Sequence, residues 1–465
     1  MIPILPGNVA SATASTTYDV ANSCRFNSAD SAYMHKTPSG AGSTRKLSFS
    51  CWFKLTELAA TRGGAYNVFH SVTDGLNRWV ISIDDSDKLF IGHYNGSSWN
   101  MLLNSNQLLR DISAFYNLIV IIDTEEGTDT NRAKVFLNGT QITSWSTATY
   151  PAEDYDGIWC KNSTTEVGRY APASAQYGGF YLAEVVLCDG QTYTNTDFGE
   201  FDEDSPTIWK PKDVSGLTFG TNGFYLDFED SSNLGNDANG GTDLTEVNLA
   251  ATDQATDTPT NNFCTMNPLI PTSNVTFSEG NCKIVSDASN PMTGAGVGTF
   301  GLTAGKWYYE VKIASLVGNH THGAVSELTT ELYTNVGALQ NDTGVTSWIN
   351  GDGGEVVVDG TATTADYGLY TDGQIMGVAL DIDNYNITYL RNGSALVSDF
   401  NMSTTRGTIF PLIKTGVNTT SEVNFGGCSA FTISSAQSDA NGYGNFEHAP
   451  PSGYLALCTK NLGSD

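Results

Sequence analysis

Paired carboxylates near residue 200 are the first candidates for acid–base chemistry in this chain. The segment 200–204 (EFDED) is its most acidic run. On an extended strand, side chains two residues apart share a face at about 6.5–7 Å, which is near the carboxylate spacing that glycoside hydrolysis uses. The run also precedes Pro206, which favours a solvated acidic turn instead. No nucleophile motif of the G-x-S-x-G type and no phosphate loop of the G-x-x-x-x-G-K-[ST] type is present.

Two histidines, His320 and His322, form a candidate zinc pair. On a strand they would share one face, and imidazole nitrogens are common zinc ligands. No third ligand lies near them in the sequence, and the flanking Gly318 and Gly323 favour a loop.

Candidate calcium ligands follow an apolar run near residue 226. Asp227, Glu229 and Asp230 supply hard carboxylate oxygens, and Asn233 and Asn236 lie close in sequence. The spacing does not fit the D-x-[DN]-x-[DN]-G loop, so a solvated turn is the alternative. The sequence establishes no cofactor, and calcium is the candidate that we carry forward.

Four tryptophans are candidate ligand-contacting residues, because each lies near turn residues. They are Trp99, Trp145, Trp159 and Trp348. An exposed aromatic ring can bind the apolar face of a sugar through contact area and CH–π interactions. Packing in the core is the alternative for each of them.

The elements that must position these residues are strands. Large apolar residues occupy every second position from Met376 to Ile382, which predicts a strand with one buried face. A turn at 383–386 and a second β-rich run follow. Asn392-Gly393 then predicts a type I′ hairpin turn, because both central residues need positive φ. We therefore predict an antiparallel meander over 373–396.

This meander and three other motifs resemble the SPRY domain family. The three are the segments 305–311 (GKWYYEV), 410–412 (FPL) and 423–426 (VNFG), and they stand in the family's order. The resemblance implies a β-sandwich that presents binding loops at one end, and it implies no catalysis. Trp307 and Tyr309 lie two residues apart, so we expect them to face the core rather than a ligand.

A second set of strand patterns lies in the first half of the chain. The alternation in 47–55 (LSFSCWFKL) predicts a strand with an aromatic face, and apolar runs follow at 115–123, 134–142 and 178–190. Together these segments resemble a laminin-G/concanavalin A-like domain over about residues 21–200, with 225–228 as a late edge or closing strand. The resemblance implies a β-sandwich and, in many such domains, bound calcium.

The concanavalin A-like fold also includes glycosidases, whose strand pattern is E-x-D-x-x-E. Here Glu200 and Asp202 are followed by Ser205, where the last glutamate should stand. We therefore predict that the protein is not an enzyme.

Composition agrees with an all-β fold: two β-sandwich domains (jelly-roll, concanavalin A-like and SPRY-like) with irregular termini. The 465 residues include 48 glycines and only 15% charged residues, which favours strands and turns over long charged helices. The formal charge of −28 argues against nucleic acid as a partner. The eight cysteines form no C-x-x-C pair, and buried thiols are expected at Cys51 and Cys188.

No apolar run approaches the roughly 18 residues of a spanning helix, so we expect no membrane insertion. The first residues make a poor secretory signal, so we expect synthesis in the cytosol.

Five parts are predicted along the chain. They are an N-terminal arm at 1–20, the first sandwich at 21–228, a linker at 229–270, the second sandwich at 271–437 and a tail at 438–465. The polar, glycine-rich composition of 229–270 is the reason for the linker.

The order of these parts resembles a class of marine tailed-bacteriophage virion proteins. The bridge 256–269 (TDTPTNNFCTMNPL) and the tail segment 446–462 (FEHAPPSGYLALCTKNL) belong to this resemblance. It implies a structural protein of the virion surface, assembled in the host cytoplasm. We favour a tail fibre or spike adhesin that contacts a host-surface glycan or protein. A capsid decoration or head-fibre protein is one alternative, and a secreted carbohydrate-binding protein or glycosidase is the other.

Both ends of the chain hold apolar residues without strand alternation. Free ends fray unless something holds them. We therefore expect at least one end to pack on another subunit or on a neighbouring virion protein, with a homo-oligomer, a trimer, as the first guess. The alternative is that each end folds back on its own sandwich.

Overall fold

The computed structural model describes residues 18–62, 64–73, 76–170, 176–270, 275–286, 294–315, 320–330, 342–349, 353–416 and 418–463. Within these residues the chain is nearly all β-structure, which confirms the predicted fold class. The α-helices among them, α1 (Ala59–Arg62) and α2 (Thr459–Leu462), have four residues each. No helix in the described ranges is long and apolar enough to span a membrane.

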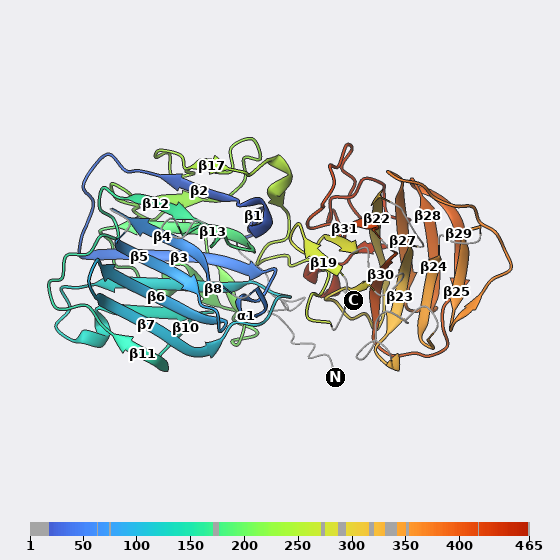
Figure 1. The fold of residues 1–465 in the computed structure, drawn as a ribbon, viewed down its shortest axis with the longest axis horizontal. Coiled ribbons are helices and arrows are strands. Elements are labelled where there is room, and N and C mark those ends of the chain that lie inside the picture. The colour runs from blue at the N-terminus through green and yellow to red at the C-terminus, as the bar shows by residue number, and fades with distance from the viewer. Residues whose placement is uncertain are drawn as a thin grey trace. The chain divides into compact units, whose positions relative to one another are not determined.

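The chain divides into two compact units, and the division falls between Thr260 and Asn261. Figure 1 colours the N-terminal unit from blue to green and the C-terminal unit from yellow to red. The predicted arm at 1–20 lies outside the described residues up to residue 17.

Two eight-stranded antiparallel sheets form the described part of the N-terminal unit, together with a short ribbon. The first sheet has the order β10-β9-β8-β3-β13-β1-β18, with β16 paired to β13. Its strands are β1 (Ser23–Phe26), β3 (Lys46–Leu55), β8 (Tyr116–Asp123), β9 (Ala133–Leu137), β10 (Thr140–Gln141), β13 (Phe180–Asp189), β16 (Phe224–Leu226) and β18 (Gln254–Ala255).

The second sheet has the order β11-β7-β6-β5-β4-β12-β2-β17. Its strands are β2 (Tyr33–Lys36), β4 (Tyr66–Val72), β5 (Asn77–Ile83), β6 (Lys88–Asn95), β7 (Trp99–Leu108), β11 (Trp145–Thr149), β12 (Thr164–Val167) and β17 (Thr245–Val247). The ribbon consists of β14 (Gly199–Phe201) and β15 (Trp209–Pro211).

The two sheets pack face to face around one core. In β3 the predicted aromatic face is confirmed, since Phe49, Cys51 and Phe53 are all buried in that core. Phe49 meets Phe69 of β4 across the sandwich with ring centroids 5.0 Å apart. Along β3 every second side chain thus faces inward, and the residues between them face outward.

The predicted linker at 229–270 is wrong for its first thirty or so residues, which belong to the N-terminal sandwich. β17 pairs with β2 and β18 pairs with β1, so each closes an end of one sheet. Leu234 and Leu244 are buried in the core. The segment is held further by Asp257, whose carboxylate meets the buried Lys54 ammonium at 2.8 Å. The linker was predicted from the polar composition of 229–270. A few buried apolar side chains and the backbone pairing of β17 and β18 are nevertheless enough to order residues 229–260.

The C-terminal unit is a second sandwich of two sheets. The third sheet has the order β19-β20-β31-β22-β27-β28-β29, with β32 paired to β22. Its strands are β19 (Val275–Ser278), β20 (Lys283–Ser286), β22 (Lys306–Ser315), β27 (Ile375–Asp381), β28 (Asn386–Arg391), β29 (Ser394–Asn401), β31 (Thr420–Asn424) and β32 (Leu455–Ala456). The fourth sheet has the order β21-β30-β23-β24-β25-β26. Its strands are β21 (Gly294–Val297), β23 (Thr321–Ser326), β24 (Val345–Ile349), β25 (Glu355–Val358), β26 (Thr361–Ala362) and β30 (Ile409–Thr415).

The predicted meander is confirmed as β27, β28 and β29, which pair in sequence order. The apolar residues at even positions from Met376 to Ile382 all lie in the core. Asn392 and Gly393 have φ of 48° and 76°, as a type I′ turn requires.

Trp307 and Tyr309 also face this core, as predicted, and both are fully buried. The indole of Trp307 donates a hydrogen bond to the Ala304 carbonyl at 2.7 Å. The Tyr309 hydroxyl donates to the Gly323 carbonyl of the fourth sheet at 2.6 Å.

The C-terminal segment 438–463 covers the outward face of the third sheet. Phe446 packs edge-on against Tyr308 of β22, with centroids 5.1 Å apart. β32 runs parallel to β22, with Leu455 opposite Trp307. For this end of the chain the structure shows the alternative, in which the tail folds back on its own sandwich.

Glu310 fastens this segment to the sheet. Its buried carboxylate accepts the backbone N–H of Glu447 at 2.9 Å and that of His448 at 2.8 Å. The same carboxylate accepts the Asn424 side-chain amide at 3.3 Å. Two donors of the tail therefore depend on one acceptor that points outward from β22.

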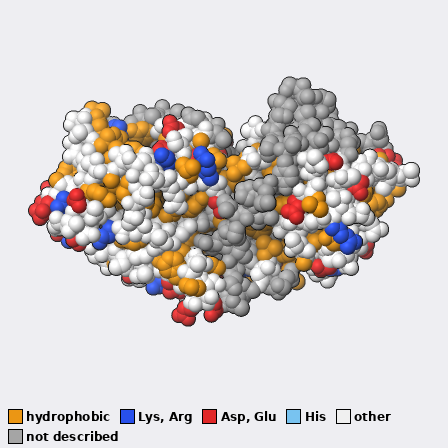
Figure 2. Space-filling model, turned by 90° about the horizontal axis from the view of Figure 1, so that it is seen from below, with side chains coloured by type: hydrophobic (Ala, Val, Ile, Leu, Met, Phe, Trp, Pro, Cys, Tyr) orange, Lys and Arg blue, Asp and Glu red, His pale blue; other side chains and the backbone are white. Residues whose placement is uncertain are grey.

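The eight cysteines are all buried thiols, which confirms the expectation for Cys51 and Cys188. The exterior matches the low charge content of the sequence. In Figure 2, white atoms of the backbone and of uncharged polar side chains make up most of the described surface on that face, with acidic and basic groups scattered among them.

Replacing Trp307 by alanine should lower the free energy of unfolding of the C-terminal unit by about 3–5 kcal/mol, because it leaves a cavity in the core. Urea denaturation monitored by circular dichroism would measure the change. Leu328→Ala, which truncates a 59% exposed side chain of the same unit, is the control and should have little effect. An unchanged unfolding midpoint for Trp307→Ala would contradict the core assignment.

Replacing Glu310 by glutamine should loosen the tail, because a glutamine offers one acceptor oxygen where two backbone donors now bind. The lost hydrogen bond is worth about 1–3 kcal/mol when its donor stays buried. Hydrogen–deuterium exchange should become faster at Glu447 and His448, while Glu355→Gln leaves it unchanged. Equal protection of the tail in both variants would show that Glu310 does not hold it.

Candidate functional site

A cavity of about 520 Å³ opens on the outward face of the second sheet and is lined by residues of β4, β5, β6 and β7. Its volume lies within the range of about 300–1,000 Å³ that is typical of small-ligand sites. The side chains that line it include Asn67, Arg78, Ser82, Phe90, Trp99, Tyr170 and Gln176.

Strand alternation places these residues on the outside. In β5, Trp79 and Ile81 point into the core and are fully buried, so Arg78, Val80 and Ser82 point outward. Arg78 and Ser82 are four residues apart, so the cavity extends about 13 Å along the strand.

A backbone feature of β6 positions Trp99. A Cβ atom at Gly92 would lie 2.5 Å from the Trp99 ring, so only glycine lets the indole lie against this strand. Phe90 and Tyr94, on either side of Gly92 and on the same face, each have their ring 5.2 Å from that of Trp99. The indole is thus held between two rings and leaves part of its surface open.

The guanidinium of Arg78 lies among three aromatic rings. Its Cζ is 4.6 Å from the Tyr94 ring centroid, 5.5 Å from that of Trp99 and 5.7 Å from that of Tyr170. Each of these distances is within the range of a cation–π interaction.

Arg78 forms no ion pair with the described carboxylates. One Nη donates to the Leu76 carbonyl at 3.4 Å, and the buried Nε has no acceptor among the described residues. The chain has 50 acidic and only 22 basic residues, so a carboxylate partner would be the usual environment of an arginine. Arg78 is surrounded by rings instead, and it is therefore available to bind a ligand.

Two carboxylates stand at the other end of the cavity, in the turn between β5 and β6. Asp84 is used by the turn, because it accepts the backbone N–H groups of Ser86 and Lys88 and the side-chain amide of Asn104, each at 2.9 Å. Asp85 is exposed and, among the described residues, makes one long contact, from the Ser86 hydroxyl at 3.4 Å. Asp85 therefore keeps most of its capacity to accept hydrogen bonds from a ligand.

Tyr170 packs against a buried histidine of β4, His70. The rings of His70 and Tyr170 meet edge to face at 4.9 Å. Burial lowers the pKa of His70, so it packs as a neutral imidazole. Burial also raises the pKa of Tyr170, which keeps its hydroxyl protonated as a donor.

The four predicted tryptophans lie in three different environments. Trp99 lines the cavity. Trp159 and Trp348 are fully buried core residues, so the prediction that they contact a ligand is wrong. Trp145 is partly buried on the edge strand β11 and packs against the core. Nearness to turn residues in the sequence did not distinguish the rings inside the sandwich from the ring on its face.

The acidic run at 200–204 begins in β14 of the ribbon and continues into the turn that leads to β15. Glu200 and Asp202 both contact the ammonium of Lys210, at 3.5 and 3.4 Å. Burial opposes ionisation of Asp202, but hydrogen bonds from Ser205 and Lys210 outweigh it and lower the pKa of the carboxyl. A general acid at neutral pH needs the opposite shift.

The predicted calcium ligands do not converge. Asp227 accepts the backbone N–H of Glu229 at 3.1 Å, and Asp230 accepts that of Ser232 at 2.9 Å, so both close local turns. Within the described ranges, no three Asp, Glu, His or Cys side chains lie close enough to hold a metal ion. Carboxylate-rich turns of this kind cannot be told from calcium loops by composition.

His320 and His322 are core residues rather than a zinc pair. One ring nitrogen of His320 is 2.6 Å from the Tyr370 hydroxyl, and the other is 2.5 Å from that of Ser421. Both imidazoles are fully buried. Burial lowers the pKa of His320 to about 3, so the ring is neutral at physiological pH.

Sequence reasoning missed Arg78, Tyr94 and Tyr170. The signal for Arg78 was the strict alternation of β5, in which a charged residue shares a face with Val80 and Ser82. Tyr94 precedes and Trp99 follows the turn at 96–98, which pairs two rings across a hairpin. Tyr170 comes from a distant part of the sequence and had no local signal.

Residues 306–428 match the family model of the SPRY domain. The C-terminal unit therefore contains a SPRY domain, as its four motifs predicted. No curated protein matches the chain.

Several solved structures are similar to parts of the chain. The SPRY domain of human HERC1 is 14% identical, with a TM-score of 0.27, and the match covers 36% of this chain and 99% of that domain. The TRIM65 PSpry domain is 15% identical, with a TM-score of 0.27 and coverages of 35% and 91%. A Bacteroides ovatus protein described provisionally as carbohydrate binding is 14% identical, with a TM-score of 0.33 and coverages of 49% and 58%.

The buried histidine pair predicts an acid-sensitive C-terminal unit. An unfolded histidine has a pKa of about 6.5, and His320 in the fold has one of about 3. The unfolded state therefore binds more protons below pH 6.5, so stability is full above that pH and falls as the pH drops toward 3. The slope for one histidine is about 1.4 kcal/mol per pH unit.

His320→Gln keeps polar contacts near Tyr370 and Ser421 but cannot titrate. Urea unfolding at a series of pH values should show a shallower loss of stability in this variant than in the wild type. His35→Gln, at a partly exposed site in the other unit, is the control. Parallel pH curves for wild type and His320→Gln would contradict the assignment.

Proposed function

We propose that the protein is a glycan-binding adhesion protein and that the cavity around Arg78 and Trp99 binds a neutral oligosaccharide. The observation that carries the proposal is the guanidinium of Arg78, which lies among three rings and has no carboxylate partner within the described residues. The SPRY domain of the C-terminal unit supports a binding role rather than a catalytic one.

The groups around the cavity suit a sugar. Trp99 offers an aromatic surface for the apolar face of a pyranose ring. Arg78, Asn67 and Gln176 can donate hydrogen bonds to hydroxyl oxygens, and Asp85 can accept from hydroxyl groups. Donors, acceptors and an apolar platform thus occur together along one strand face.

Charge favours a neutral ligand over an anionic one. Asp84 and Asp85 line the same cavity as Arg78, and the whole chain has a formal charge of −28. An anionic sugar would be repelled over the approach to the site, where exposed charges act over about 8–10 Å.

The setting that we propose is a bacteriophage virion, with the protein as a tail fibre or spike component. Its support is the resemblance of the ordered parts, including the bridge 256–269 and the tail segment 446–462, to marine tailed-phage virion proteins. A homo-oligomer, a trimer as the first guess, would present several copies of a weak site and raise the avidity for a host surface. Antibody labelling of purified virions in electron microscopy tests this setting, and label over the capsid would favour a decoration protein.

If the cavity binds a glycan, removing the Trp99 ring should clearly weaken the affinity for that glycan. On an array of neutral and uronate-containing oligosaccharides, the full chain should bind neutral members and release them intact. Trp99→Ala should weaken binding by about tenfold or more, which is the value of one ring platform. Trp99→Phe should recover part of the affinity, and Gly92→Ala should weaken binding because its Cβ displaces the indole.

Tyr443→Ala, which truncates a partly buried ring of the other unit, is the matched control. Two results would refute the proposal: equal binding by Trp99→Ala and Tyr443→Ala, or a preference for uronates over every neutral sugar. Steady release of reducing sugar that is lost in Glu200→Ala would refute the non-enzymatic role.

A further inference from the structure

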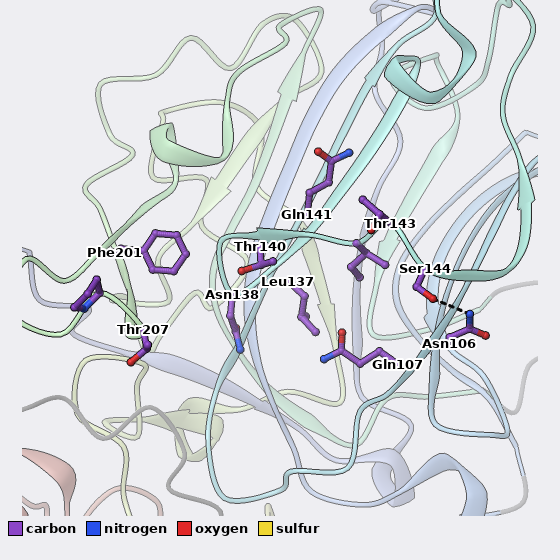
Figure 3. Close-up of a pocket in the computed structure, with 12 residues that line it drawn as sticks. Asn106, Gln107, Leu137, Asn138, Thr140, Gln141, Thr143, Ser144, Phe201 and Thr207 are labelled. Atoms are coloured by element: carbon purple, nitrogen blue, oxygen red, sulfur yellow. Dashed lines mark hydrogen bonds between the residues drawn. The ribbon is translucent and has the colours of Figure 1, made fainter.

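A second hollow, of about 900 Å³, lies at the sheet edge of the N-terminal unit (Figure 3). β10 is the edge strand of the first sheet and β11 that of the second. The residues that connect these strands line the hollow, together with the end of β7 and part of the ribbon segment 201–207. We call it the edge groove.

The floor of the edge groove is apolar and its walls are polar. Leu137 and Ile142 form the floor and belong to the sandwich core. The wall side chains are amides and hydroxyls, chiefly Asn106, Gln107, Asn138, Thr140, Gln141 and Thr207. Among the described residues that line the groove, none has an ionisable side chain.

An aromatic ring stands over one wall. Phe201 is 41% exposed, and its ring meets Trp209 edge to face at 4.9 Å. Trp209 is itself fixed, because its indole donates to Asn117 at 2.9 Å. Figure 3 shows Phe201 and Thr207 on one side of the hairpin residues Asn138 and Thr140. The Phe201 ring therefore packs against a buried, hydrogen-bonded tryptophan and leaves part of its surface exposed.

The polar wall groups are available to a ligand. Asn106 donates to the Ser144 hydroxyl at 2.9 Å, and its side-chain carbonyl oxygen accepts no hydrogen bond from the described residues. The Asn138 carbonyl oxygen accepts the backbone N–H of Asn117, which leaves its NH₂ group as a donor. Within the described part of the chain, the side chains of Gln107, Thr140 and Gln141 make no hydrogen bond to protein, and all three are exposed.

These observations select the ligand class. A charged ligand would find no counter-charge in the groove, and a purely apolar one would leave the amides unpaired. Amides and hydroxyls can both donate and accept, which matches a polyol, and one open ring matches the apolar face of a sugar.

We infer that the edge groove is a second binding subsite for a neutral saccharide, with Phe201 as its stacking platform. The inference rests on the proposed function only for the class of ligand, because the groove and the Trp99 cavity share no lining residue. Two subsites on one unit let a branched or long glycan bind in two places, which lowers its dissociation rate.

The test uses the full chain with Trp99→Ala, so that the first cavity is impaired. Side-chain NH₂ signals of asparagine and glutamine are followed by NMR during titration with cellotetraose, maltotetraose, mannotetraose and xylotetraose. At least one of these sugars should shift the signals of Gln107, Asn138 or Gln141 in a saturable way. Adding Phe201→Ala should weaken that binding about tenfold, and Gln141→Ala should weaken it as well.

Leu369→Ala, which removes a 52% exposed side chain of the other unit, is the matched control and should change nothing. Binding should not vary between about 0.05 and 0.5 M sodium chloride, because no wall group is charged. The inference is wrong if no sugar shifts these amides, or if Phe201→Ala binds as tightly as Leu369→Ala. The Trp99 indole signal of the wild-type chain reports the first cavity separately, so failure of one site is distinguishable from failure of the other.

Discussion

The side chains on the outward faces of the sheets determine which other segments of the chain pack there and where a ligand can bind. Strand alternation sends every second side chain away from the sandwich core, so a large outward residue must be covered by other chain or remain open to a ligand. On the third sheet the outward Tyr308 is covered by the C-terminal segment, which Glu310 fastens through two backbone N–H groups. On the second sheet the outward Arg78 and Trp99 line an open cavity.

The same constraint explains the chemistry of that cavity. An arginine on an acidic surface would normally pair with a carboxylate, yet Arg78 lies among the rings of Tyr94, Trp99 and Tyr170. Aromatic rings do not accept the N–H groups that lie in the plane of the guanidinium, so these groups stay free to donate. A carboxylate partner would occupy them. Gly92 lets Trp99 lie against the sheet, and the buried His70 supports Tyr170, so the site is held in place without a ligand.

Local alternation made much of the fold predictable. The meander at 373–396, the aromatic face of β3 and the core positions of Trp307 and Tyr309 all follow from a period of two. The pairing of 229–260 with the N-terminal sandwich and the docking of the tail did not follow from local patterns, because both depend on pairs that are distant in sequence, such as Thr245 with His35 and Leu455 with Trp307. In the site, Trp99 was among four candidate rings, but Arg78 and Tyr170 meet only in the folded chain.

The most direct test of the glycan site is hydroxyl-radical footprinting of the full chain, with and without a neutral oligosaccharide that it binds. Oxidation of exposed rings, read by mass spectrometry, reports which surfaces the ligand covers. Protection of Trp99, Tyr94 and Tyr170, with no change at Tyr443 of the other unit, is the result expected from a sugar in the cavity. Bound sugar with unchanged oxidation of Trp99 would place the ligand elsewhere and contradict the account.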